Sequence, residues 1–202
     1  MRAPGPAFCL IAALALPLGA SLGPASPSVL TVILNFEGPH SRASVQEMKR
    51  ESAVILQASG VRLNWHLLGD DPYASYPGLV LMTFRGTCEF EPTPLADETG
   101  ALAITHASDG HILPFGEVNC DRVVNTARRA MSGTDFTRAN QLVGRAMGRV
   151  VAHELVHMLT KSAEHGTEGV EQPALSGQQL IENSLPLSAF DIGRLVRERS
   201  KQ

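Results

Sequence analysis

The stretch that organises the chain is residues 142–159, Leu142-Val-Gly-Arg-Ala-Met-Gly-Arg-Val-Val-Ala-His153-Glu154-Leu-Val-His157-Met-Leu159. Its apolar residues recur at the three-to-four spacing that is typical of an amphipathic helix. The helix is expected to begin after Ser132-Gly133, with Thr134 or Asp135 as its N-cap, and to end near Leu159. The apolar positions that lead at this spacing into the two histidines are Leu142, Ala146 and Val150. Both histidines therefore continue the inward face of the predicted helix.

The helix carries the spacing HExxH, as His153-Glu154-Leu155-Val156-His157. Residues four apart on a helix project from the same face one turn apart, so both imidazoles can bind one metal ion. Neutral imidazoles are ligands of Zn²⁺, which lowers the pKa of a water molecule toward about 7. Glu154 lies beside them, where a carboxylate can take a proton from a water that attacks a carbonyl. The alternative is two core histidines satisfied by hydrogen bonds, which leaves several buried polar groups to pair.

A zinc site needs a third protein ligand, and the nearest candidate is His165, which is followed by Gly166. It lies eight residues after His157, which allows the helix to end near Thr160 and the chain to fold back. The alternative is a solvent-exposed His165 with a carboxylate as ligand, because a site of two histidines and one glutamate is equally suitable for zinc. The candidate carboxylates are Glu164, Glu168 and Glu171.

With this motif the sequence resembles the zincin metallopeptidases. Among them it is most similar to the metzincins and to short secreted bacterial zincin-like proteins with an HELxH helix and a nearby His-Gly. The resemblance covers about residues 134–170. It implies that His153, His157 and His165 are zinc ligands and that Glu154 is the general base. It also implies an edge strand that pairs with an extended substrate, for which 101–106 and 111–118 are the candidates.

Two departures from the metzincin pattern HExxHxxGxxH are visible. The glycine position falls on Thr160 and the third histidine position on Ala163, so the third histidine arrives two residues later here. No methionine follows Met158, so the methionine turn that metzincins place beneath the metal is missing.

The remaining segments alternate between strand and helix patterns. Strands are predicted over 29–36, 61–68, 78–84, 101–105 and 118–124, and further helices over 41–59, 176–183 and 188–199. Gly144 and Gly148 lower helix propensity, which predicts close packing of the long helix against the sheet. The predicted fold class is α+β and zincin-like. A mixed, twisted sheet packs on two main helices, 41–59 and 134–159, and a small helical part follows at the C-terminus.

The first residues have the pattern of an export signal. Arg2 precedes an apolar run over 8–18, and small residues with a Pro- and Ser-rich stretch follow. A membrane anchor is the alternative, but the run is shorter than the roughly 20 residues that span a bilayer. We therefore expect residues 1–25 to be a signal peptide and linker, and 26–202 to be one metallopeptidase domain. The mature protein would be secreted or periplasmic, without a stable membrane anchor.

Cleavage of that leader would remove Cys9 and leave Cys88 and Cys120. An even pair of cysteines in an exported chain predicts a disulfide, because the compartment is oxidising. The alternative is two buried thiols.

The amino-acid composition limits the kinds of binding partner that are expected for this chain. The chain has 202 residues, 44% of them hydrophobic, and a formal charge of -3, as expected for one globular domain. This mildly acidic balance disfavours nucleic acids and anionic membranes as partners. The motif instead predicts a peptide or protein substrate and one Zn²⁺ per chain.

The prediction from these patterns is a secreted zinc-dependent endopeptidase that hydrolyses peptide bonds with a zinc-activated water and Glu154 as base. Two alternatives belong to other classes of protein. One is an exported zinc-binding protein without catalytic turnover, and the other is an exported binding module without metal. Metal content separates the second alternative from the other two hypotheses, and the activity of Glu154→Gln separates enzyme from binder.

Overall fold

The computed structural model of the chain describes residues 28–70, 75–76, 78–94 and 100–201, together with Met1. The predicted leader and linker, apart from Met1, lie outside the described residues. None of the helices in these ranges combines the length and hydropathy needed to cross a bilayer.

In the described part of the chain, five strands form one mixed sheet of order β2-β1-β3-β5-β4. The strands are β1 (Ser28–Phe36), β2 (Val61–Leu67), β3 (Leu79–Arg85), β4 (Ala103–Ser108) and β5 (His111–Asn119). The pairs β1 with β2, β1 with β3 and β3 with β5 are parallel. Strand β4 runs antiparallel to β5 and forms an edge of the sheet. The predicted α+β class with a mixed sheet is therefore confirmed.

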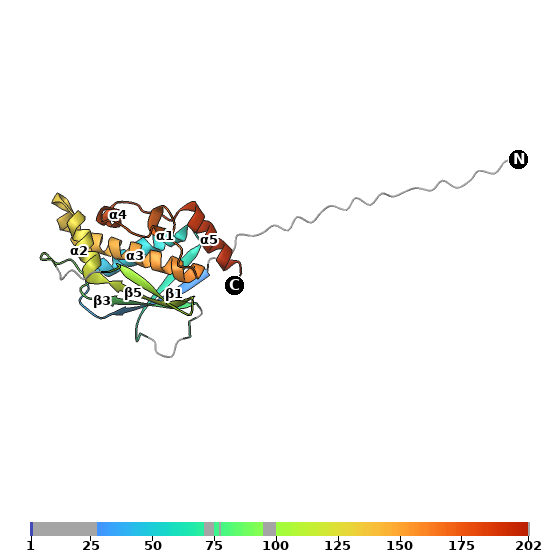
Figure 1. Cartoon of the computed structure of the whole chain (residues 1–202), viewed down its shortest axis with the longest axis horizontal. Helices are drawn as coiled ribbons and strands as arrows, with labels where there is room; N and C mark the ends of the chain where they lie inside the picture. The colour runs from blue at the N-terminus through green and yellow to red at the C-terminus, as the bar shows by residue number, and fades with distance from the viewer. Residues whose placement is uncertain (2–27, 71–74, 77, 95–99, 202) are drawn as a thin grey trace.

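The helices gather on one side of this sheet (Figure 1). They are α1 (Arg42–Gln57), α2 (Cys120–Ala130), α3 (Ala139–Thr160), α4 (Gly177–Ile181) and α5 (Ala189–Arg199). Two 3-10 helices, η1 (Gly133–Arg138) and η2 (Gly169–Glu171), flank α3. Helix α1 contacts β2, whereas α3 contacts β4 and β5. Helix α3 thus lies next to the antiparallel edge of the sheet.

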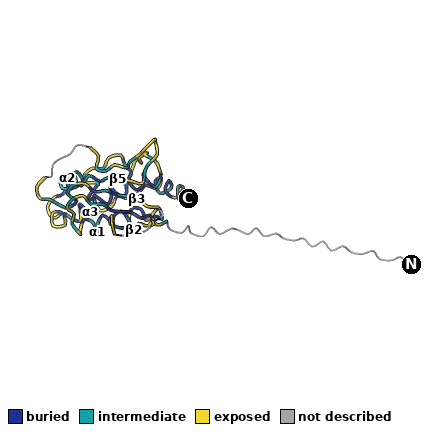
Figure 2. Tube along the Cα trace, turned by 90° about the horizontal axis from the view of Figure 1, so that it is seen from below, coloured by how far each residue is buried: buried dark blue, intermediate teal, exposed yellow. Residues whose placement is uncertain are grey.

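The core lies between the sheet and the two long helices. Val32, Met82 and Phe84 are fully buried on the strand side, and they form one cluster with Leu142 and Leu155 of α3. In Figure 2 the buried residues follow α3 and the central strands through the interior, and exposed residues lie at the periphery. Parallel strands covered by helices read as nearly continuous apolar runs, which explains why β1 is recognisable in the sequence.

The glycines of α3 face a helix, which corrects the expected packing against the sheet. A Cβ atom added at Gly144 would lie 2.4 Å from the Ser44 carbonyl oxygen, and one at Gly148 would lie 2.8 Å from that of Met48. The hydroxyl of Ser52 donates to the Gly148 carbonyl oxygen (3.0 Å). The two glycines therefore allow close approach of α1 and α3.

Two predicted boundaries are also wrong. Residues 118–124 were expected to be a strand, but β5 ends at Asn119 and α2 begins at Cys120. The Asn119 side chain accepts from the Arg122 backbone N–H (3.0 Å), which is an N-cap contact that starts a helix. The long helix was expected to start at Thr134 or Asp135, but these residues belong to η1 and α3 starts at Ala139.

The predicted disulfide joins Cys88, just after β3, to Cys120, the first residue of α2. Both cysteines are fully buried, and their Cα atoms lie 4.8 Å apart. An intramolecular disulfide fits an extracytoplasmic location.

Replacing both cysteines, as Cys88→Ala with Cys120→Ala, is expected to lower the free energy of unfolding by about 3 to 4 kcal/mol. The reason is that the bond closes a loop with a sequence separation of 32 residues and so restricts the unfolded chain. Chemical denaturation measures the loss. Reduction of the wild-type disulfide should produce a similar loss, and a double variant as stable as the oxidised protein would contradict the stabilising role.

Candidate metal centre

Three histidines converge at the C-terminal end of α3. His153 and His157 lie one turn apart on α3, and their Nε2 atoms are 3.0 Å apart. Lys161 ends the helix in the left-handed conformation (φ 51°), which turns the chain back. This return brings His165 to the other two rings, and all three ring centroids lie 4.7–5.1 Å from one another. One ligand nitrogen from each ring lies within 4.8 Å of the other two.

Backbone carbonyls orient the two rings on the helix. Nδ1–H of His153 donates to the Val170 carbonyl oxygen (2.9 Å), and Nδ1–H of His157 donates to that of Ser162 (2.8 Å). These bonds assign the proton to Nδ1 of each ring. The lone pair of each Nε2 is then directed toward the space between the three histidines. Metal-binding histidines commonly have their second ring nitrogen held in this way.

The charge state of the rings also suits ligation. Burial lowers the pKa of His153 and of His157, and the neighbouring histidines act in the same direction. Neutral imidazole is the form that binds a metal ion. Tetrahedral zinc with Zn–N bonds of 2.0–2.1 Å places ligand nitrogens about 3.3 Å apart. One nitrogen from each ring of the triad, His153, His157 and His165, lies within 4.8 Å of the other two, so the triad could hold a metal ion.

The carboxylates proposed as alternative ligands lie elsewhere. Glu164 and Glu168 are exposed, and the described residues that could hold a metal ion together are the three histidines alone. Glu171 is fully buried, and its Oε1 lies 3.6 Å from Nδ1 of His153, on the side of the ring that faces away from the triad. Burial, with Asp191 as the next cause, raises the pKa of Glu171 to about 9.

Glu154 follows His153 on α3, and its side chain is buried, with 6% exposure. The Thr105 hydroxyl of β4 donates to its Oε2 at 2.6 Å. Burial raises the pKa of the Glu154 carboxyl, and the bond from Thr105 opposes that rise. A raised pKa suits a carboxylate that takes up a proton near neutral pH. Sequence reasoning missed Thr105, although it is the last residue of the predicted strand 101–105.

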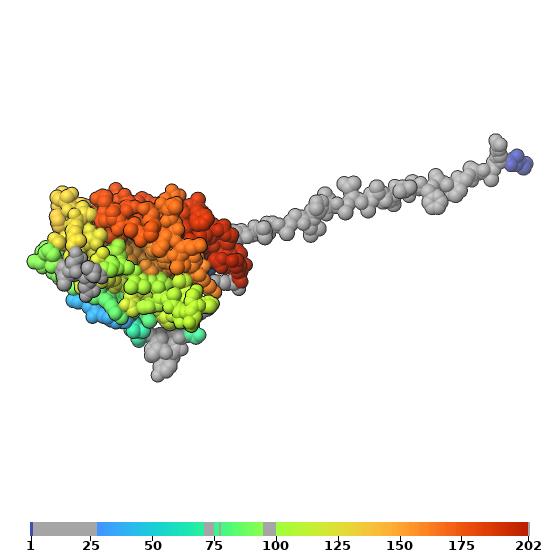
Figure 3. Space-filling model, viewed as in Figure 1, coloured from blue at the N-terminus to red at the C-terminus, as the bar shows by residue number. Residues whose placement is uncertain are grey.

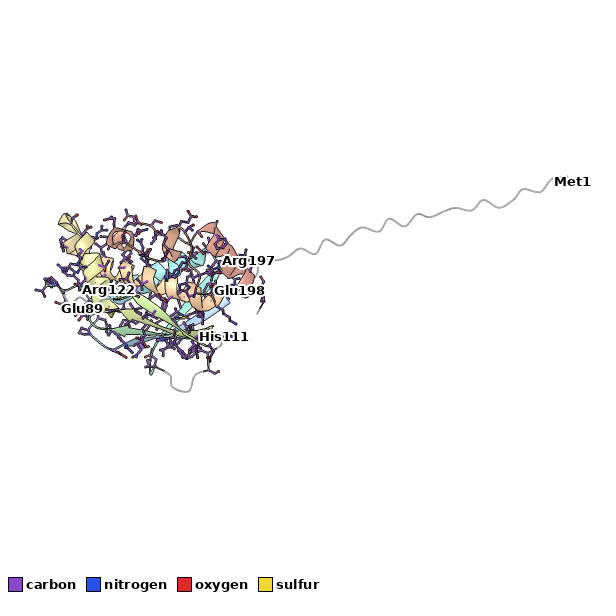
Figure 4. All side chains as sticks on the ribbon, in the orientation of Figure 1. Met1, Glu89, His111, Arg122, Arg197 and Glu198 are labelled. Carbon is purple, nitrogen blue, oxygen red and sulfur yellow. A yellow bond between two sulfur atoms is a disulfide. The ribbon has the colours of Figure 1, made fainter. Side chains whose placement is uncertain are left out.

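A cavity of about 610 Å³ opens beside the triad. The starting residues of β4 form one wall and Gln172–Leu175 form part of another, with His153, Glu154 and His157 also lining it. In Figure 3 the yellow-green surface of β4 and β5 adjoins the orange C-terminal surface on the same face of the molecule. Arg122, which is labelled on α2 in Figure 4, and Thr126 line the cavity as well. The cavity thus joins the triad to the edge of the sheet.

The structure also distinguishes the two candidate edge strands. Strand β4, which matches the candidate 101–106, lies at the edge, whereas β5, which matches 111–118, lies between β3 and β4. A register irregularity between Thr105 and Ala107 interrupts the pairing of β4 with β5 beside the Glu154 contact. Such irregularities re-aim side chains near functional sites.

Comparison with known proteins gives no independent assignment of this site. No protein-family model and no curated protein matches the chain.

Proposed function

We propose that the chain is a secreted zinc-dependent endopeptidase with a zincin-like fold. The observation that carries the proposal is the convergence of three imidazoles next to a buried glutamate, at a cavity bordered by an edge strand. The carbonyl contacts at His153 and His157 support it, because they fix the tautomer that a ligand needs. The position of β4 next to α3 agrees with what the resemblance to zincins implies.

In this proposal His153, His157 and His165 hold the metal ion. Bound zinc would supply a Lewis acid that polarises a carbonyl and makes water more acidic. Glu154 takes the proton from the attacking water and returns it to the leaving amine. Thr105 keeps the Glu154 carboxyl group against β4 through its 2.6 Å hydrogen bond.

The substrate would bind in an extended conformation along β4. Among the described residues, no strand pairs with the side of β4 that faces away from β5. Free N–H and C=O groups along an edge can pair with a peptide by β-augmentation. The cavity next to Leu102, Val150 and Leu175 would then receive a side chain of that peptide.

Export is part of the same proposal. The disulfide between Cys88 and Cys120 fits an oxidising compartment, and the N-terminal pattern is typical of a cleaved leader.

Metal content tests the proposed function first. Elemental mass spectrometry of the purified mature protein is expected to find about one zinc per chain, because the three imidazole nitrogens are already grouped. The double variant His153→Ala with His157→Ala should lose the metal but keep its circular dichroism spectrum. A wild-type protein that stays metal-free under zinc-loading conditions would overturn the proposal.

A further inference from the structure

The cavity beside the triad extends to the first turn of α2. The backbone N–H of Asn119 donates to the Leu102 carbonyl oxygen (2.9 Å), so the start of β4 lies next to the start of α2. Arg122 follows three residues after Asn119 and lines the cavity together with Leu102. Figure 4 shows Arg122 at this end of β5 and His111, the first residue of β5, at the opposite end. The same cavity therefore contains the histidines and an arginine.

The spacing along β4 gives the distance between these two ends of the cavity. Glu154 accepts from the Thr105 hydroxyl, and Leu102 precedes Thr105 by three residues. An extended chain rises about 3.3 Å per residue, so Leu102 lies about 10 Å along the chain from Thr105. A peptide that pairs with β4 has the same rise. Such a peptide therefore passes Arg122 within about three residues of the bond next to Glu154.

Few charged side chains line the cavity. Among the lining residues that the structure describes, Arg122 is the single lysine or arginine and Glu154 is the single carboxylate. Arg122 is partly buried, whereas Arg129 of the same helix is exposed. A guanidinium group carries a positive charge and offers its N–H donors in a planar fork that matches a carboxylate. The α2 end of the cavity is therefore suited to an anionic group of a substrate.

Apolar side chains form other parts of the cavity wall. They belong to Leu102, Ile112, Val150 and Leu175. Apolar walls limit the access of water, and opposite charges attract more strongly in surroundings of lower dielectric constant than in water. The same walls can pack on the methylene groups of a long side chain that ends in a charge. A glutamate side chain, with an apolar stem and a terminal carboxylate, matches both parts of this cavity.

We propose that Arg122 is a specificity-determining residue, which binds a carboxylate of the peptide substrate near the bond that is cleaved. The carboxylate belongs to an acidic side chain or to the C-terminus of the peptide. Both sources offer two oxygen atoms that a guanidinium group can bind in a bidentate pair. The inference rests on the proposed function and names its substrate class, which is peptides with a negative charge within a few residues of the cleaved bond.

Matched peptides test this specificity on the zinc-loaded protein. Each set carries Glu, Gln or Lys at one position, and the position is moved through the three residues on either side of the cleaved bond. For wild type, Glu at one position is expected to raise kcat/KM by about 10- to 100-fold over Gln, as is typical of a hydrogen bond between charged groups. Arg122→Gln should remove this preference, and Arg122→Glu should change it to a preference for Lys.

Two controls belong to this experiment. Arg129→Gln removes an exposed arginine of the same helix that does not line the cavity, so it should keep the wild-type preference. Acidic residues are favourable in the first turn of a helix, so Arg122→Glu should keep the Tm of wild type. Peptides with a free or an amidated C-terminus separate the two sources of the carboxylate. A preference for Glu that survives amidation indicates the side chain, and a preference for the free C-terminus that Arg122→Gln removes indicates the terminal group.

Either of two results would overturn the inference. The first is a wild-type protein whose kcat/KM is the same with and without a carboxylate in every set of peptides. The second is a preference that Arg122→Gln leaves unchanged. A zinc-loaded wild type that cleaves no peptide contradicts the proposed function instead, which is a separate outcome. In that case the Kd values of fluorescently labelled Glu and Gln peptides still test whether Arg122 binds a carboxylate.

Discussion

Glu154→Gln is expected to lower the kcat/KM for peptide hydrolysis by about 10² to 10⁴-fold, while one zinc per chain remains bound. Glutamine has the shape of glutamate but cannot accept the proton of the attacking water. Glu154 is not a member of the histidine group that could hold a metal ion, so its replacement should leave the ligands in place. Hydrolysis of a fluorogenic peptide library by zinc-loaded wild type and variant measures the effect.

The control for this experiment is Glu164→Gln, which changes an exposed glutamate next to His165 and should keep wild-type activity. Equal activity of Glu154→Gln and wild type would contradict the general-base role. A zinc-loaded wild type that cleaves no peptide would instead favour an exported zinc-binding protein without turnover.

The part of the site that depends on local geometry could be predicted from the sequence. His153 and His157 are four residues apart, and a helix brings such a pair to one face whatever the rest of the fold does. The position of His165 depends on the loop, so spacing alone left three glutamates as alternatives. The left-handed conformation of Lys161, a non-glycine residue, is what directs the loop back to α3.

The start of α2 could not be predicted from the sequence, because strand propensity and a helix N-cap compete there. Val123 and Val124 are β-branched and favour a strand, but both are buried on one face of a helix. The deciding contact is the Asn119 side chain, which accepts from the N–H of Arg122. The disulfide at Cys120 then joins this first turn to the segment after β3.

Contacts between segments that are distant in the sequence could not be predicted either. Thr105 and Glu154 are 49 residues apart in the sequence, and their hydrogen bond exists only because β4 lies beside α3. Glu171 was considered as a direct ligand, whereas the structure places it at the far nitrogen of His153. Both side chains are positioned by tertiary packing, on which sequence periodicity gives no information.

His165→Ala is expected to weaken zinc binding by more than the 10- to 100-fold that is typical of losing an outer partner, because it removes a direct ligand. The side chain is exposed, so the Tm of the metal-free variant should stay close to that of wild type. Elemental analysis after dialysis against a weak chelator, together with the Kd, measures the loss.

Glu168→Gln, which changes an exposed glutamate of the same loop, is the control for the His165 experiment and should keep the wild-type zinc Kd. If His165 is a direct ligand, His165→Ala should raise the zinc Kd and alter the absorption spectrum of the cobalt-loaded protein, whereas the control variant should change neither. Unchanged zinc content in His165→Ala would transfer the third ligand role to a carboxylate. Glu164 and Glu168 are exposed in the same loop and would have to move to the triad, whereas Glu171 would have to pass from the far side of the His153 ring. The zinc Kd and the cobalt spectrum together therefore test whether His165 or a carboxylate is the third ligand.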